Sequence, residues 1–134
     1  AAQRMLFAAG DGSMFRDARG SYHMLVHRFA GRNGSTAGAP CGGHAYSPDG
    51  LSWTFAETAA YTTAVAWANG TRAAFYRRER PQPLVRNGTL VAVFNGAWPC
   101  HFGSQDDDSR DAARGCASLT VVTPVAEPHD PSHA

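Results

Sequence analysis

Apolar and aromatic residues form short runs along the chain, separated by residues that favour tight turns. Asp49-Gly50, Asn69-Gly70 and Asn87-Gly88 each lie between two such runs. These dipeptides supply the positive φ angles that hairpin turns require. The runs show no helical period, and they cover residues 14–17, 21–29, 43–47, 51–55, 62–67, 71–78, 83–85, 89–94 and 118–125. The pattern predicts an all-β chain in which consecutive antiparallel strands form a meander.

The spacing of the runs also predicts an architecture. Four-stranded meanders joined by irregular loops are typical of β-propeller blades. We therefore predict that residues 1–126 form about two to three blades of a β-propeller, with a β-sandwich as the alternative. A complete propeller has at least about four blades, so the chain would be a partial propeller domain. The polar segment 127–134 contains two prolines and is predicted to be disordered.

Charge is concentrated in the stretch FYRRERPQP, residues 75–83. If residues 71–80 form one strand, alternation places Arg78 and Arg80 on one face and Arg77 and Glu79 on the other. Glu79 would then lie at the end of that strand. One interpretation is an ion-paired carboxylate at a strand end. The other is a carboxyl group positioned for proton transfer.

Six segments taken in order support the second interpretation. They are RDARGSYHMLVHRF, GGHAYSPDGLSWTF, AYTTAVAWANGT, YRRERPQPLV, LVAVFNGAWPC and SLTVVTPV. Together they resemble the five-bladed β-propeller glycoside hydrolases of family 43 and the eukaryotic relatives of that family. The resemblance covers about residues 11–125, although none of the segments is unique to the family.

The resemblance implies hydrolysis of glycosidic bonds by carboxylates at the central funnel of the propeller. The general acid of the family is a glutamate, which in some members stands in a Glu-Arg-Pro motif that Glu79-Arg80-Pro81 matches. Asp11 takes the place of the aspartate that orients this acid, although its two neighbours differ from the family's Glu-Asp-Pro. The catalytic base of the family comes from a blade upstream of this sequence. The alternatives are a non-catalytic glycan-binding propeller and a structural or interaction propeller.

Three residues are candidates for contacts with a sugar. Arg80 belongs to the Glu-Arg-Pro match, and Trp98 at a strand end is the tryptophan best placed to stack on a sugar ring. His44 could face the funnel, where family members hold a histidine, but a hydrogen-bonded strand histidine is the simpler interpretation. Asp17 is interpreted as a turn residue, because aspartate favours the first position of a tight turn.

The total charge and hydropathy narrow the range of partners. The formal net charge is +1, which gives no electrostatic reason to expect nucleic acid. No apolar run approaches the ~20 residues of a membrane-spanning helix. The resemblance implies an oligo- or polysaccharide as the partner, and the incomplete propeller predicts contacts with either the missing blades of the same polypeptide or further copies of this chain.

No metal site or other cofactor is predicted from the residues. No Cys/His cluster has the spacing of a zinc site. His23 and His27 are four positions apart, which on a strand separates them by about 13 Å at ~3.3 Å per residue, too far to share one ion. The resemblance leaves open a calcium ion in the centre of the propeller.

Cysteines and sequons bear on the compartment. Cys100 and Cys116 flank a polar loop, and a disulfide between them would stabilise the fold by about 3 kcal/mol; free thiols are the alternative. Cys41 is left unpaired in either case. Three sequons begin at Asn33, Asn69 and Asn87. Although turn chemistry alone explains the last two asparagines, the set favours a secreted or secretory-pathway protein.

Overall fold

The computed structural model describes residues 9–28, 41–99 and 117–125. All regular structure in these ranges is β-strand, and every strand pair is antiparallel. The all-β prediction is therefore confirmed for this part of the chain. Within the same ranges there is no helix long and apolar enough to cross a membrane.

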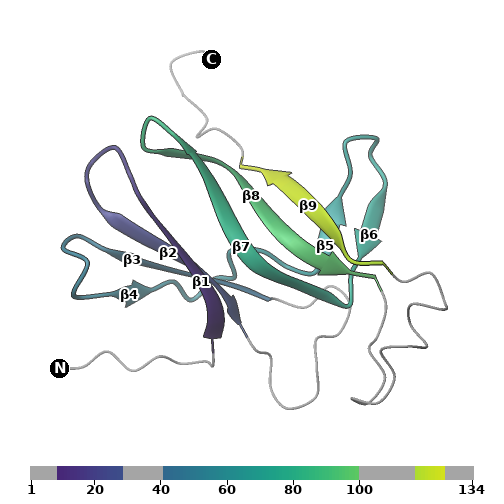
Figure 1. Cartoon of the computed structure of the whole chain (residues 1–134), viewed down its shortest axis with the longest axis horizontal. Coiled ribbons are helices and arrows are strands. Elements are labelled where there is room, and N and C mark those ends of the chain that lie inside the picture. The colour runs from purple at the N-terminus through teal and green to yellow at the C-terminus, as the bar shows by residue number, and fades with distance from the viewer. Residues whose placement is uncertain (1–8, 29–40, 100–116, 126–134) are drawn as a thin grey trace.

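The first sheet is a four-stranded meander in which each strand pairs with the next one in sequence (Figure 1). Its strands are β1 (Ala9–Arg16), β2 (Tyr22–Arg28), β3 (Gly42–Ser47) and β4 (Thr54–Phe55). The expected strand at 51–55 is thus reduced to two residues. The turn before it is fixed locally, because the Asp49 carboxylate accepts hydrogen bonds from the backbone NH groups of Leu51 and Ser52, both at 2.8 Å.

The second meander has three strands in the order β7 (Arg77–Arg86), β8 (Thr89–Trp98) and β9 (Leu119–Pro124). A two-stranded hairpin, β5 (Ala64–Ala66) and β6 (Arg72–Ala74), precedes it. Asn87 and Gly88 join β7 to β8 with φ angles of 49° and 74°. This is the left-handed conformation for which an Asn-Gly turn is suited.

The strand boundaries around Glu79 differ from the expectation. The single strand predicted through residues 71–80 is interrupted at Phe75 and Tyr76, and a new strand begins at Arg77. Glu79 therefore lies near the beginning of β7 and not at the end of a strand. Pro81 and Pro83 are tolerated within β7 because it is an edge strand. The pairing with β8 is shifted between Glu79 and Gln82, where Arg80 has a φ of 52°.

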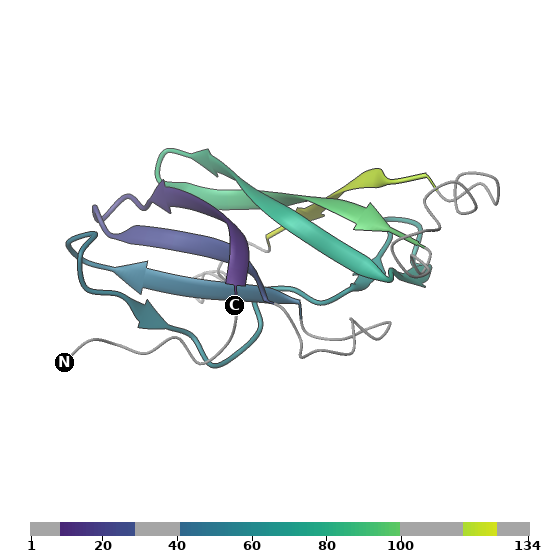
Figure 2. The ribbon, with the colours of Figure 1, turned by 60° about the horizontal axis from the view of Figure 1, so that its bottom comes forward.

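The two meanders meet along their first strands. β7 contacts both β1 and β2, and Figure 2 shows β1 and β7 on the sides of the two sheets that face each other. The Ser13 hydroxyl donates to Oε1 of Gln82 at 3.3 Å. At the far end of the two strands, the NH group of Ala18 donates to the carbonyl oxygen of Gly88 at 3.1 Å. These two hydrogen bonds connect the sheets, which nevertheless remain separate because β1 and β7 do not pair as strands of one sheet.

The apolar core is divided between the sheets. One cluster lies between the β5–β6 hairpin and the second meander and consists of Val65, Phe75, Ala97 and Val121. In the first meander, the Tyr61 ring is buried against Gly42 of β3. The Tyr61 carbonyl oxygen accepts hydrogen bonds from the NH groups of Cys41 and Gly42. These hydrogen bonds hold the segment between β4 and β5 against the beginning of β3.

Candidate functional site

Glu79 lies on β7, where it meets the first sheet. Its side chain is only 15 % exposed, and its Oε1 atom is 3.7 Å from Nη1 of Arg77. Arg77 and Glu79 thus share a side of the strand, as alternation predicts. The contact with Arg77 agrees with the interpretation of Glu79 as an ion-paired carboxylate. The low exposure of its side chain, however, distinguishes Glu79 from an ordinary surface carboxylate.

Asp11 lies on β1, within an irregularity of the β1–β2 pairing. The register shifts between Gly10 and Ser13, and Asp11 has a φ of 50°. Aspartate is one of the few residues other than glycine that adopts this conformation with little strain. The irregularity leaves Asp11 exposed to solvent.

His27 of β2 connects these two carboxylates electrostatically. It is 5 % exposed and is paired with Gly10 on one side and Gly42 on the other. Burial lowers the pKa of His27, the negative charges of Glu79 and Asp11 oppose that shift, and Arg77 adds to it. The structure therefore brings residues of β1, β2 and β7 to one buried imidazole. From the sequence, His27 is a candidate only for a metal site shared with His23. Its relation to Glu79 depends on the contact of β7 with β1 and β2, which no local sequence pattern indicates.

Arg78, the neighbour of Glu79, is directed into the protein. Its side chain is 3 % exposed and its guanidinium group makes three hydrogen bonds. The acceptors are Oδ1 of Asn95 at 3.0 Å, the carbonyl oxygen of Thr62 at 3.1 Å and Oγ1 of Thr123 at 2.6 Å. Burial lowers the pKa of Arg78, while Cys41 and Tyr61 oppose that shift.

Asn95 links the side chain of Arg78 to the backbone of Glu79 through two hydrogen bonds. Its Oδ1 atom accepts from Nε of Arg78, and its Nδ2 group donates to the carbonyl oxygen of Glu79 at 3.3 Å. Because Asn95 is 1 % exposed, both bonds are shielded from water. The buried arginine thus acts as a positioning residue for the strand segment that carries Glu79.

Of the other residues expected to contact a sugar, Trp98 lies close to Glu79, because its ring covers Gly96, the partner of Glu79 on β8. Arg80 is exposed. Trp98 is partly buried at the end of β8, opposite Arg77 in the β7–β8 pairing. His44 belongs to a different cluster, described next.

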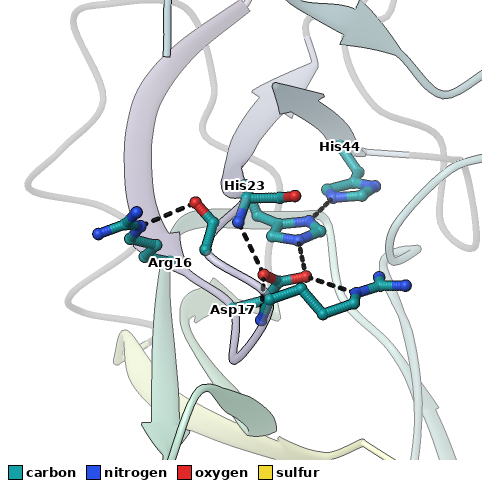
Figure 3. A network of polar contacts seen from close by, with 7 residues as sticks. Arg16, Asp17, His23 and His44 are labelled. Carbon is teal, nitrogen blue, oxygen red and sulfur yellow. Dashed lines mark hydrogen bonds and ion pairs between the residues drawn. The ribbon is translucent and has the colours of Figure 1, made fainter. Parts of the chain in front are cut away.

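The second cluster consists of Asp17, His23 and His44 (Figure 3). Oδ2 of Asp17 is 3.4 Å from Nε2 of His23, and Nδ1 of His23 is 3.0 Å from Nε2 of His44. The Phe15 ring is stacked on His23 with centroids 4.9 Å apart. Diagonal pairing across β2 and β3 brings the two histidines together, and this proximity cannot be seen from their separation in the sequence.

Asp17 also organises the β1–β2 turn, as its sequence context predicts. Its Oδ1 atom accepts hydrogen bonds from the NH groups of Arg19 at 3.0 Å and Ser21 at 2.8 Å. Burial would raise the pKa of Asp17, but its hydrogen bonds with Ser21, His23 and Arg19 outweigh that effect and hold the pKa below its usual range. Asp17 is therefore a carboxylate at neutral pH, and it fixes the orientation of His23.

A cavity of about 540 Å³ adjoins this second cluster. It lies between the two meanders, with Asp17, His23 and His44 on one side and residues of β7–β8 on the other. Its apolar lining includes Phe15, Leu25, Leu90, Val93 and Val125.

Several expected features lie at the surface or outside the described ranges. Asn69 and Asn87 are exposed in the β5–β6 and β7–β8 turns. Asn33, Cys100, Cys116 and segment 127–134 lie outside the described residues. Cys41 is a free thiol with no exposed surface. The described residues contain no group of three or more His, Cys, Asp or Glu side chains that could hold a metal ion.

Comparison with known proteins adds no family to this description. No protein-family model matches the sequence, and searches of the curated proteins and of the solved structures find no match.

Proposed function

We propose that this chain is part of a family-43-type β-propeller whose carbohydrate-active site lies where β1, β2 and β7 meet. In this proposal Glu79 is the proton donor to the glycosidic oxygen and Asp11 is the carboxylate that accompanies it. The observation that carries the proposal is the contact of β7, which bears Glu79, with β1, which bears Asp11, and with β2. The buried His27 of β2 supports it, because the charges of Glu79 and Asp11 both oppose the lowering of its pKa by burial.

The arrangement of the sheets supports the same proposal. The blades of a propeller are separate antiparallel sheets placed radially around a central channel. The two meanders here remain separate sheets, and the edge strand that begins each of them, β1 or β7, contacts the other. In a propeller these two strands would be the innermost strands of adjacent blades, and Asp11 and Glu79 would face the channel.

Proton donation by Glu79 requires that Arg77 can move away from it. The 3.7 Å separation is longer than a good charge-assisted hydrogen bond, and the Arg77 side chain is 47 % exposed. A sugar ring that occupies the channel could therefore displace the guanidinium group and bring the glycosidic oxygen to Glu79.

Hydrolysis also needs a second carboxyl group on the other side of the bond. The remaining carboxylates of the described residues are engaged or lie elsewhere. Asp17 is bound to His23, Asp49 organises the β3–β4 turn, and Glu57 is exposed between β4 and β5. In our proposal the catalytic base is therefore supplied from outside the described residues.

The second candidate is glycan binding without hydrolysis. The Arg77–Glu79 ion pair favours it, because a carboxylate paired with a guanidinium group presents both an acceptor and donors to sugar hydroxyls. In this alternative Glu79 accepts hydrogen bonds from the sugar and donates no proton to it.

The test measures both binding and the release of reducing sugar on an oligosaccharide panel, with the chain joined to the blades that this proposal places upstream of it. We compare Glu79→Gln with Glu57→Gln, which alters an exposed carboxylate between β4 and β5. Release that is lost in Glu79→Gln and kept in Glu57→Gln supports the hydrolase. Binding without release supports the second candidate. Release that survives Glu79→Gln contradicts the acid role, and the absence of both binding and release contradicts both candidates.

We further propose that the protein enters the secretory pathway. Asn69 and Asn87 lie in exposed turns, where an oligosaccharide could be attached without displacing the core. Expression in a eukaryotic secretory host followed by enzymatic removal of N-glycans tests this proposal. A mass shift that disappears in Asn69→Gln and Asn87→Gln variants supports glycosylation, and an unmodified mass at both sites contradicts it.

A further inference from the structure

The cavity between the two meanders has the size of a small-molecule site. Its volume of about 540 Å³ falls within the ~300–1,000 Å³ that is usual for ligand pockets. Such pockets combine apolar walls with a few polar atoms in fixed positions. The apolar walls are accompanied by the Asp17–His23–His44 cluster and by three further polar side chains, those of Arg19, Tyr61 and Thr89. The Tyr61 hydroxyl already donates to the carbonyl oxygen of Val26.

Hydrogen bonds determine which nitrogen of each histidine carries a proton. The Asp17 carboxylate can only accept, so Nε2 of His23 carries hydrogen, and in the tautomer with a single ring proton Nδ1 of His23 is the acceptor. Nε2 of His44, which lies 3.0 Å from that Nδ1, must then be the donor. Neutral His44 is therefore left with an unprotonated Nδ1.

This remaining nitrogen of His44 is available to a ligand. Among the described residues the imidazole of His44 makes a hydrogen bond only to His23, and His44 lines the cavity. Figure 3 shows its second ring nitrogen on the side of the ring away from His23. Burial, and then the neighbouring His23, lower the pKa of His44, so the imidazole stays neutral at pH 7.

We propose that this cavity binds a small phenol, with its aromatic ring against the apolar walls and its hydroxyl donating to Nδ1 of His44. The stacked rings of Phe15 and His23 supply a flat surface of the kind on which aromatic molecules pack. The proposal does not depend on the function proposed for Glu79.

The polar atoms of the wall disfavour other classes of ligand. A cation would need a free carboxylate, but both oxygens of Asp17 already accept hydrogen bonds from Ser21, Arg19 and His23. A carboxylate ligand at the same position would meet the lone pair of neutral His44. The arginine in the described lining, Arg19, is already paired with Asp17 and is 88 % exposed, so an ion pair with it would contribute little. A sugar would bury several hydroxyls against apolar side chains, which is unfavourable without partners. A ligand with one hydrogen-bond donor on an apolar ring system matches the Nδ1 acceptor of His44 and the apolar side chains of the wall.

The test compares two bicyclic probes by calorimetric titration at pH 7. 2-Naphthol carries a hydroxyl, whereas 2-methoxynaphthalene has a similar shape and cannot donate. We expect 2-naphthol to bind about three- to tenfold more tightly, the ratio that one net hydrogen bond provides. Equal affinities for the two probes, or no binding of either, would overturn the proposal.

Two variants locate the site. His44→Phe keeps a ring of similar size but removes the acceptor, so 2-naphthol should bind no better than 2-methoxynaphthalene. Thr89→Trp places a large side chain at the cavity wall and should weaken both probes. Its control, Thr120→Trp, alters another exposed strand threonine that does not line the cavity. Unchanged binding in Thr89→Trp would contradict this location even if His44→Phe failed to fold.

Glu79→Gln separates this proposal from the carbohydrate function. Glu79 does not line the cavity, so the naphthol affinity of this variant should equal that of the unmodified chain. A large loss of naphthol binding in Glu79→Gln would place the probe at the other site and overturn the proposal.

Discussion

The guanidinium carbon of Arg78 lies 4.9 Å from the centre of the Tyr61 ring, and both side chains are buried. Cations over aromatic faces gain more when they are shielded from water. Because the same guanidinium group also holds Asn95 and Thr123, it connects Tyr61 of the β4–β5 segment with β7, β8 and β9. A residue that resembles a surface charge in the sequence is thus a central contact of the structure.

Replacement of Arg78 should therefore be costly. Arg78→Met leaves the acceptor groups of Asn95 and Thr123 without their partner, and an unsatisfied buried polar group costs about 1–3 kcal/mol. We expect the free energy of unfolding to fall by about 2–4 kcal/mol in urea denaturation. Arg80→Met alters an exposed arginine two positions away and should change it by less than about 0.5 kcal/mol. Equal losses in the two variants would contradict the role assigned to Arg78.

Gly42 should not tolerate even a methyl group. A Cβ atom at this position would clash with Cδ1 of Tyr61, and that ring is confined by its burial and by Arg78. We expect Gly42→Ala to lower the free energy of unfolding by about 1–3 kcal/mol, as overpacking does. In Gly12→Ala the new Cβ atom would meet Met24 and Val26 at 3.6 Å, an ordinary contact. Thermal unfolding of the two variants should rank them in this order, and the reverse order would be inconsistent with the packing.

The Cys41 thiol should be unreactive in the folded protein. Burial, together with the charge of Glu79, raises its pKa to about 12 despite the opposing charge of Arg78, and the thiolate is the reactive form. In a Cys100→Ser, Cys116→Ser variant, Ellman's reagent at pH 8 should label Cys41 only after denaturant is added. Rapid labelling without denaturant would show that Cys41 is accessible in the folded state.

Stability should fall as the pH drops below about 6.5. His27 and His44 both have a lowered pKa in the folded state, whereas the unfolded chain binds protons with a histidine pKa of about 6.5. The unfolded state therefore binds more protons in this window, so acid favours unfolding. The contribution is complete above about pH 6.5 and is lost as the pH falls toward the folded-state values.

Urea unfolding between pH 5 and pH 8 measures this dependence. The midpoint should rise from pH 5 to about pH 6.5 and then level off, and His44→Phe should reduce the slope. Asp17 does not interfere, because its lowered pKa makes its contribution change only below about pH 4. A midpoint that stays constant or falls between pH 5 and pH 6.5 would contradict neutral buried histidines.

The local features of the fold could be predicted from the sequence, because their causes are local. Asn69-Gly70 and Asn87-Gly88 mark the turns of two hairpins, where the backbone needs positive φ angles. The interruption at Phe75 could not be predicted, because the apolar pattern continues through it. Phe75 ends the β5–β6 hairpin by packing into a core with Val65 and Val121. That packing depends on the tertiary arrangement.

The two candidate sites differ from the sequence-based expectations for the same reason. The sequence predicts a turn residue at Asp17 and a strand histidine at His44, and each prediction describes a local role. Their connection through His23 requires the pairing of β2 with β3. The relation of Glu79 to His27 requires the contact of β7 with β2. Neither the Asp17–His23–His44 cluster nor the relation of Glu79 to His27 can be predicted from the spacing of residues along one strand.

The register shift in β7 inverts the alternation of its buried and exposed side chains. Before the shift Arg78 is buried, and after it Pro81 is buried while Gln82 and Leu84 are exposed. Two residues, Arg80 and Pro81, thus stand opposite the single residue Asn95 of β8. Deleting Arg80 alone would leave Pro81 opposite Asn95, so every later residue of β7 would keep its face and its partner. The same deletion at another position of β7 would turn over the side chains beyond it. Homologues with a shorter β7 should therefore lack the residue at position 80 rather than any other.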